Sequence, residues 1–174
     1  MMNEDKRHIK IITYLFSTMT ALSLSFLSLN VYNYVGSLNA LNKIDISVTN
    51  IVMNPVGNET RITLIFLLIN PTTYSNLKFS SLQCRLFLNF NGGEEYLGWI
   101  NYSSLLNESL KPKKQISIST TISIPKSKSQ FFLNYGLNSK IKLRIKGVIY
   151  LVTPIMKYYK SIDIITMNLS DYIF

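Results

Sequence analysis

The chain has 174 residues, of which 47% are hydrophobic and only 16% are charged. These values exclude a disordered chain, and the length allows one domain with its own core beside a membrane anchor. Lys and Arg number 18 against 9 Asp and Glu, yet the sequence contains no basic run or basic helix of the kind that reads nucleic acid. The charge balance therefore favours an anionic partner or a membrane surface and argues against nucleic acid.

An uncharged apolar stretch follows the basic N-terminus. No charged residue lies between Lys10 and Lys43, and the most apolar part spans residues 11–35. A helix of about 25 residues is long enough to cross a hydrocarbon core of about 30 Å. We therefore expect residues 1–10 to be an N-terminal tail, 11–35 a transmembrane helix in the lipid bilayer, and 36–43 a linker. A cleaved signal peptide is the alternative, but the apolar run is long for a signal core, and no convincing pair of small residues follows it.

The flanking charges predict the orientation of this helix. Lys6, Arg7 and Lys10 precede it closely, whereas only Lys43 lies close on the other side. Basic residues near a helix end favour the cytoplasm. We expect a single-pass protein of the cell membrane, with a cytoplasmic N-terminus and the C-terminal domain outside.

Small residues recur on one face of the predicted helix, at Ser17, Ala21, Ser25 and Ser28. Such a stripe lets two membrane helices approach closely, so it is a candidate helix–helix contact. The alternative is that Ser is simply common in this segment.

After the anchor the apolar residues recur at every second position, which is typical of half-buried strands. This pattern is clear in residues 44–49, 115–124 and 140–146. Residues 60–69 are nearly all apolar, which predicts a strand in the middle of a sheet and buried on both faces.

Turn residues divide the remaining segments. Asn91, Gly92 and Gly93 predict a hairpin turn between strands at 82–90 and 94–101. Residues 126–137 break the alternation and predict one short helix, and a last strand is expected at 158–167. About seven strands without strand–helix alternation predict an all-β domain over residues 44–174, an antiparallel β-sandwich.

The order of these features resembles the late-embryogenesis-abundant type 2 family, also called the WHy (water stress and hypersensitive response) domain. The resemblance rests on an apolar strand that runs into Asn70-Pro71, the Gly92-Gly93 hairpin, a strand ending in Pro125-Lys126, and a basic–apolar strand with a central Gly147. It covers about residues 44–168, and its matching positions are structural and not catalytic. The resemblance implies an immunoglobulin-like sandwich associated with desiccation and stress tolerance, often membrane-anchored.

The sequence offers little for catalysis. The only histidine, His8, precedes the anchor, so the domain has no imidazole for a nucleophilic relay or a zinc site. Glu94-Glu95 could form half of a carboxylate pair, but a solvated turn is the better interpretation. The single Cys84 alternates with leucines and is expected to be a buried hydrophobic residue. We expect no enzyme activity, cofactor or metal.

Four sequons could carry N-linked glycans on an exported domain. They begin at Asn58, Asn101, Asn107 and Asn168, which we place at strand ends or in loops.

Basic residues alternate along the strand with Gly147, at Lys140, Lys142, Arg144 and Lys146. Because alternate side chains share one face of a strand, these four are a candidate anion-binding face. The alternatives are a solvated outer face or lysines that protect an edge strand against pairing.

Two functions follow from the sequence. The first is a membrane-tethered, non-catalytic, extracytoplasmic β-sandwich module of the stress-associated type, which acts by binding or surface protection. The second is an accessory subunit of a larger membrane or cell-surface assembly, docked on a protein partner through the helix stripe or a sheet edge.

Overall fold

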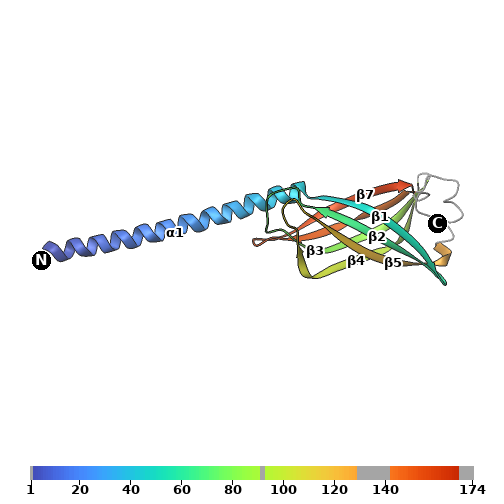
Figure 1. Ribbon diagram of the computed structural model, residues 1–174, viewed down its shortest axis with the longest axis horizontal. Helices are drawn as coiled ribbons and strands as arrows, with labels where there is room; N and C mark the ends of the chain where they lie inside the picture. Colours follow the sequence, from blue (N-terminus) through green and yellow to red (C-terminus); the bar gives the residue numbers. More distant parts are fainter. Residues whose placement is uncertain (1, 91–92, 129–141, 169–174) are drawn as a thin grey trace.

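The computed structural model describes residues 2–90, 93–128 and 142–168 and shows one long helix followed by a two-layered β domain (Figure 1). The helix is α1 (Met2–Lys43). The described strands are β1 (Asp45–Val56), β2 (Glu59–Ile69), β3 (Lys78–Phe90), β4 (Gly93–Ser109), β5 (Gln115–Pro125), β6 (Lys142–Val152) and β7 (Lys157–Asn168).

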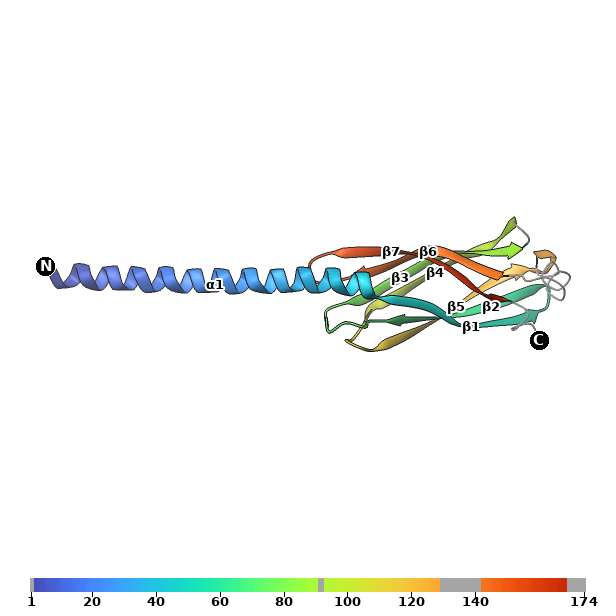
Figure 2. The ribbon, with the colours of Figure 1, turned by 90° about the horizontal axis from the view of Figure 1, so that it is seen from above.

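The strands form two antiparallel sheets that pack face to face. One sheet has the order β1-β2-β5 and the other the order β4-β3-β6-β7. Figure 2 shows these two layers nearly edge on, with the strands running along the long axis that continues the helix. The predicted all-β, antiparallel sandwich after one N-terminal helix is confirmed.

The core lies between the sheets because apolar residues alternate along most strands. β5 and β6 have regular patterns of buried and exposed positions, as their sequences predicted. The largest buried side chains come from both sheets and from the connections between them. They include Phe66, Leu68, Leu77, Phe79, Leu82, Leu88, Leu110 and Ile118.

The predicted linker at 36–43 is wrong, because α1 continues without a break to Lys43. Ala40 and Leu41 are buried in the core of the sandwich, and so is Ile44 directly after the helix. Burial of these apolar side chains stabilises the helical conformation that a free linker would lack. The helix therefore enters the domain as one of its core elements.

The rest of α1 leaves its apolar side chains exposed. The stretch His8–Lys43 contains an 18-residue segment with a mean hydropathy of 1.5 and is, by length and composition, able to cross a membrane. Hydroxyls within it donate to carbonyls of the helix itself: Thr13, Thr18 and Ser28, for example, each donate to the carbonyl four residues earlier at 2.8 Å.

A loop after β2 holds the helix against the domain. The buried side-chain amide of Asn70 donates to the carbonyls of Tyr74 and Leu110, both at 2.9 Å, and its oxygen accepts from the backbone and hydroxyl of Thr72. This fixes Tyr74, whose ring lies so close to Gly36 of α1 that an added Cβ there would meet it at 2.6 Å. The Asn70-Pro71 motif therefore has a structural role.

Three further expectations need adjustment. β2 is central in its sheet as predicted, but it is buried on one face and only half-buried on the other. β4 extends to Ser109 instead of ending near residue 101, because it keeps pairing with β3. Residues 126–128 are helical, while the rest of the predicted helix lies outside the described residues, as do residues 91–92 of the hairpin turn.

Gly147 lies where β6 crosses Cys84 of β3. An added Cβ would approach the Gln83 carbonyl oxygen at 2.2 Å and the Cys84 Cα at 2.6 Å. Both atoms belong to the backbone and cannot rotate away. The glycine therefore permits the close approach of these two central strands.

We predict that Gly147→Val destabilises the protein by roughly 1–3 kcal/mol, because β6 must move away from β3. Urea unfolding of the full chain in detergent, followed by near-UV circular dichroism, measures the change. The control is Ser161→Val, which introduces the same side chain at an exposed site of β7. Equal midpoints for the two variants would contradict the packing role of the glycine.

Asn70→Leu should cost about 1–3 kcal/mol or more, because it leaves buried carbonyls and a buried hydroxyl without their partners. The same unfolding experiment measures this loss. Ser75→Ala changes an exposed side chain of the same loop and should leave the midpoint within about 0.5 kcal/mol of the parent. A stable Asn70→Leu protein would show that the loop does not depend on this amide.

Candidate functional site

The outer face of the four-stranded sheet brings charged and aromatic side chains together from three strands. Arg85 of β3 lies between Trp99 of β4 and Lys146 of β6 in the sheet register. The next outward row places Phe87 between Tyr96 and Arg144. Of these six residues, the sequence pattern singled out only the two on β6.

The predicted basic face is only partly as expected. Lys140 lies outside the described residues. Lys142 is exposed, and Arg144 and Lys146 point outward with it. β6 lies between β3 and β7 and is not an edge strand, so the idea that its lysines protect an edge is wrong.

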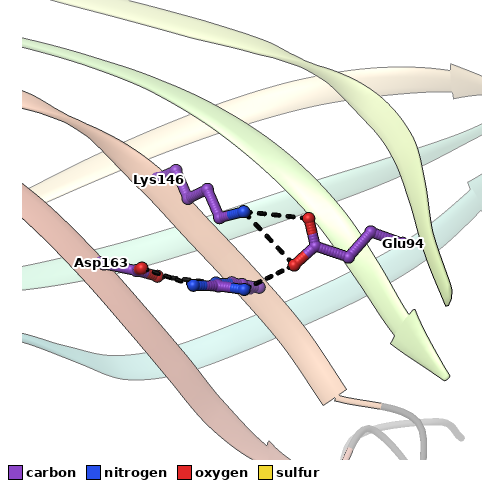
Figure 3. Close-up of polar contacts among 4 residues, drawn as sticks. Glu94, Lys146 and Asp163 are labelled. Carbon is purple, nitrogen blue, oxygen red and sulfur yellow. Dashed lines mark hydrogen bonds and ion pairs between the residues drawn. The ribbon is translucent and has the colours of Figure 1, made fainter. Parts of the chain in front are cut away.

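Two of these cations already have carboxylate partners from neighbouring strands (Figure 3). Arg144 donates to Glu94 at 2.6 Å, and its Nε and Nη2 donate to the two oxygens of Asp163 at 2.8 and 2.6 Å. Lys146 reaches the second oxygen of Glu94 at 2.9 Å. The stripe is therefore a network of compensated charges that ties β4, β6 and β7 together. Glu94 is part of it and not simply a solvated turn residue.

The hydrogen bonds of the network shift the pKa values of its residues. Hydrogen bonds from Lys146 and then Arg144 lower the pKa of Glu94 below its ordinary value of 4.5. The hydrogen bonds from Arg144 likewise lower the pKa of Asp163 below 3.8, and both carboxylates raise the pKa of Arg144. Charge-assisted bonds to the ionised forms account for these directions.

A hollow of about 730 Å³ lies beside the network on the same face. Its sides carry the exposed rings of Trp99 and Tyr96, which keep 57% and 44% of their surface accessible. The remaining lining comes from β3 and β6: Gln83, Cys84, Arg85, Phe87, Lys146, Gly147 and Val148.

A β-bulge in β4 creates the aromatic side of this hollow. Tyr96 and Trp99 are three residues apart, so a regular strand would point them to opposite faces. The register shifts between the partners of Leu86 and Phe87, and the extra residue, Leu97, is buried in the core. The bulge thereby turns both rings to the outer face, as bulges near binding sites often do. A prediction from the sequence that assumes strict alternation would place Tyr96 and Trp99 on opposite faces and would miss this arrangement.

Contacts within the hollow hold its rings in place. Phe87 and Tyr96 pack at 5.7 Å between ring centroids, and the Lys146 ammonium lies 5.1 Å from the Phe87 centroid. Lys128 donates to the Tyr96 carbonyl at 2.9 Å. Arg85, by contrast, is exposed and has no ion-pair partner among the described residues. Its guanidinium is therefore accessible at the edge of the hollow.

A second concavity of about 690 Å³ lies where α1 meets the domain. Residues 72–74 form one side, and the helix forms the other with Leu27, Val31, Val35 and neighbouring residues. Of the predicted helix stripe, Ser28 reaches this groove, while Ser17, Ala21 and Ser25 lie further along the exposed helix.

The sequons are less uniform than predicted. Asn58 lies in the exposed turn between β1 and β2, and Asn107 lies near the end of β4 with a positive φ of 48°. Asn101 is in the middle of β4 and not at a strand end, because that strand is longer than expected. Asn168 ends β7, and its side chain lies outside the described residues.

Cys84 is buried as expected, and burial raises the pKa of its thiol to about 12. A thiol with this pKa is protonated at neutral pH and is a poor nucleophile. In the described part of the chain, no group of three or more His, Cys, Asp or Glu side chains is placed to hold a metal ion.

Comparison with known proteins yields only distant structural likeness. No family model and no curated protein sequence matches the chain. The Arabidopsis thaliana protein AT1g01470 is similar over 70% of this chain and 80% of its own, with 16% identity and a TM-score of 0.45. A protein from Archaeoglobus fulgidus is similar over 71% and 92%, with 10% identity and a TM-score of 0.42.

A third structure, provisionally described as a late embryogenesis abundant protein, covers 90% of both chains with 13% identity and a TM-score of 0.40. Its description names the class that the sequence motifs resemble. At these identities and scores, the likenesses do not establish a family or an activity.

The ion network predicts how stability depends on pH. Because the pKa values of Glu94 and Asp163 are lowered in the folded state, their contribution is present above about pH 4.5 and is lost as pH falls through the lowered values. Arg144→Gln removes a partner of both carboxylates, so its melting temperature should fall less steeply below pH 4.5 than that of the parent. Lys142→Gln, on the same strand, should keep the parental slope. Identical slopes for all three proteins would contradict the network's role.

Proposed function

We propose that this protein is a membrane-tethered, non-catalytic binding module whose β-sandwich is held outside the cytoplasm by α1. The proposal follows the motif resemblance in assigning the module to the stress- and desiccation-associated, immunoglobulin-like type. Binding or surface protection is then the mode of action.

The observation that carries this proposal is the continuity of α1. One end of the helix exposes its apolar side chains over a length that suits a bilayer, and the other end is buried in the sandwich. An exposed apolar surface of this size is unfavourable in water and is expected to be covered by lipid or by another protein.

The candidate binding surface is the outer face of β3, β4 and β6. Exposed Trp, Tyr and Arg side chains are the residue types that dominate binding energy at interfaces. Because the strands run along the axis of α1, this face stands upright from a bilayer crossed by the helix (Figure 1). It is therefore directed sideways, toward other molecules at the cell surface.

The alternative function, an accessory subunit of a larger assembly, draws on the groove between α1 and residues 72–74. Its apolar lining, together with the small-residue stripe that ends at Ser28, suits a second membrane helix. A defined heteromer after mild detergent extraction would favour the subunit, and a lone protomer would favour the module.

The topology is testable by protease treatment of intact cells that produce the full chain. We expect loss of the β domain and retention of a short membrane-bound stub that contains α1. The triple variant Lys6→Gln, Arg7→Gln and Lys10→Gln should show partial protection of the domain, because it removes the charge asymmetry that sets the orientation. Full protection of the parental domain would refute the proposed orientation.

A further inference from the structure

We propose that the hollow bounded by Trp99, Tyr96, Arg85 and Lys146 binds a uronate-bearing glycan, with sugar rings on the aromatic side chains and a carboxylate on Arg85. This inference rests on the proposed function, since it names the ligand class of the same outer face.

The size and composition of the hollow suit a segment of a sugar chain. Its volume of about 730 Å³ lies in the range of small-molecule sites. The apolar C–H face of a sugar ring can pack on Trp99 and Tyr96 through dispersion and weak C–H contacts. Gln83 and Arg85 also line the hollow and can form hydrogen bonds with the hydroxyl groups at the edge of the sugar ring.

The charge of the face favours an acidic ligand. In the outward rows around the hollow, Arg85, Lys142, Arg144 and Lys146 outnumber the carboxylates Glu94 and Asp163. The two carboxylates engage Arg144 and Lys146, and the guanidinium of Arg85 beside Trp99 has no ion-pair partner among the residues that the structure describes. A planar guanidinium can bind a carboxylate through two parallel hydrogen bonds.

Two other ligand classes fit this geometry less well. The upright position of the face keeps it from lying flat on the bilayer that α1 would cross, which disfavours lipid head groups. A protein interface would bury the side chain of Lys146, and lysine is depleted in interface cores. A glycan would leave Lys146 partly hydrated.

The rings are positioned before any ligand arrives. The bulge at Leu97 fixes the directions of Tyr96 and Trp99, and Phe87 supports Tyr96 from the neighbouring strand. Rigid rings lose little conformational entropy on binding, which raises affinity for a flat ligand surface.

Trp99 is the only tryptophan in the chain, so its fluorescence reports directly on the hollow. The experiment titrates the full chain in detergent micelles with short polygalacturonate chains. Dextran serves as a neutral glycan, polyglutamate as an acidic polymer without sugar rings, and phosphatidylserine vesicles as an anionic lipid surface. We expect a saturable change in Trp99 emission with polygalacturonate alone, which weakens as salt screens the Arg85 contact.

Binding-site variants test where the glycan binds. Because Trp99→Ala lacks the fluorescent residue, its binding is measured by calorimetry. Trp99→Ala and Arg85→Gln should each weaken polygalacturonate binding about tenfold or more, the scale expected for loss of a binding anchor. The matched control is Tyr159→Ala, which removes an exposed ring from β7 outside the hollow and should bind as the parent does. Near-UV circular dichroism checks that each variant keeps the parental fold.

Three outcomes would overturn the inference: no saturable binding of polygalacturonate, equal binding of polyglutamate or vesicles, or equal losses in Tyr159→Ala and Trp99→Ala. None of these results bears on the protease topology of the domain. Conversely, a domain protected inside intact cells would refute the proposed orientation while leaving the binding measured in micelles unchanged.

Discussion

Burial of the C-terminal end of α1 in the sandwich is the interaction on which the rest of the molecule depends. Ala40, Leu41 and Ile44 contribute to the same core as the strands, and Tyr74 packs against the helix at Gly36. The buried amide of Asn70 holds the loop that carries Tyr74. Helix and sandwich share this core, and the long faces of both sheets run along the helix axis (Figure 2).

The outer faces of the two sheets carry different side chains. β5 of the three-stranded sheet exposes serines and threonines at alternate positions, and the outward apolar side chains of β2 are half-buried. The four-stranded sheet presents rings and charges. Its central strands approach closely because Gly147 leaves room for the backbone of β3, and Gly98 accommodates the side chain of Ile122 from the opposite sheet. Tight packing on the inner side thus supports a rigid array of large side chains on the outer side.

Charge compensation defines which part of that array is open to a ligand. Arg144 lies between two carboxylates, and Lys146 shares one of them while covering the Phe87 ring. Each contact is exposed and individually modest, but together they fix the side chains of three strands in one arrangement. Arg85 lies outside the network and next to Trp99, so a cation without an ion-pair partner among the described residues lines the aromatic hollow.

The sequence by itself determined the helix, the strand-rich domain and most strand positions, because hydropathy and alternation are local properties. It also placed Cys84 in the core for the same reason. Other features depended on contacts between distant segments. Residues 36–43, expected to form a linker, are helical because the sandwich covers Ala40 and Leu41. The basic side chains of β6 form an ion-pair network because Glu94 and Asp163 lie on the neighbouring strands. The bulge at Leu97 places Tyr96 and Trp99 on the same face of the sheet. Only the tertiary structure could decide these features, since pairing register and charge partners are set by which strands become neighbours.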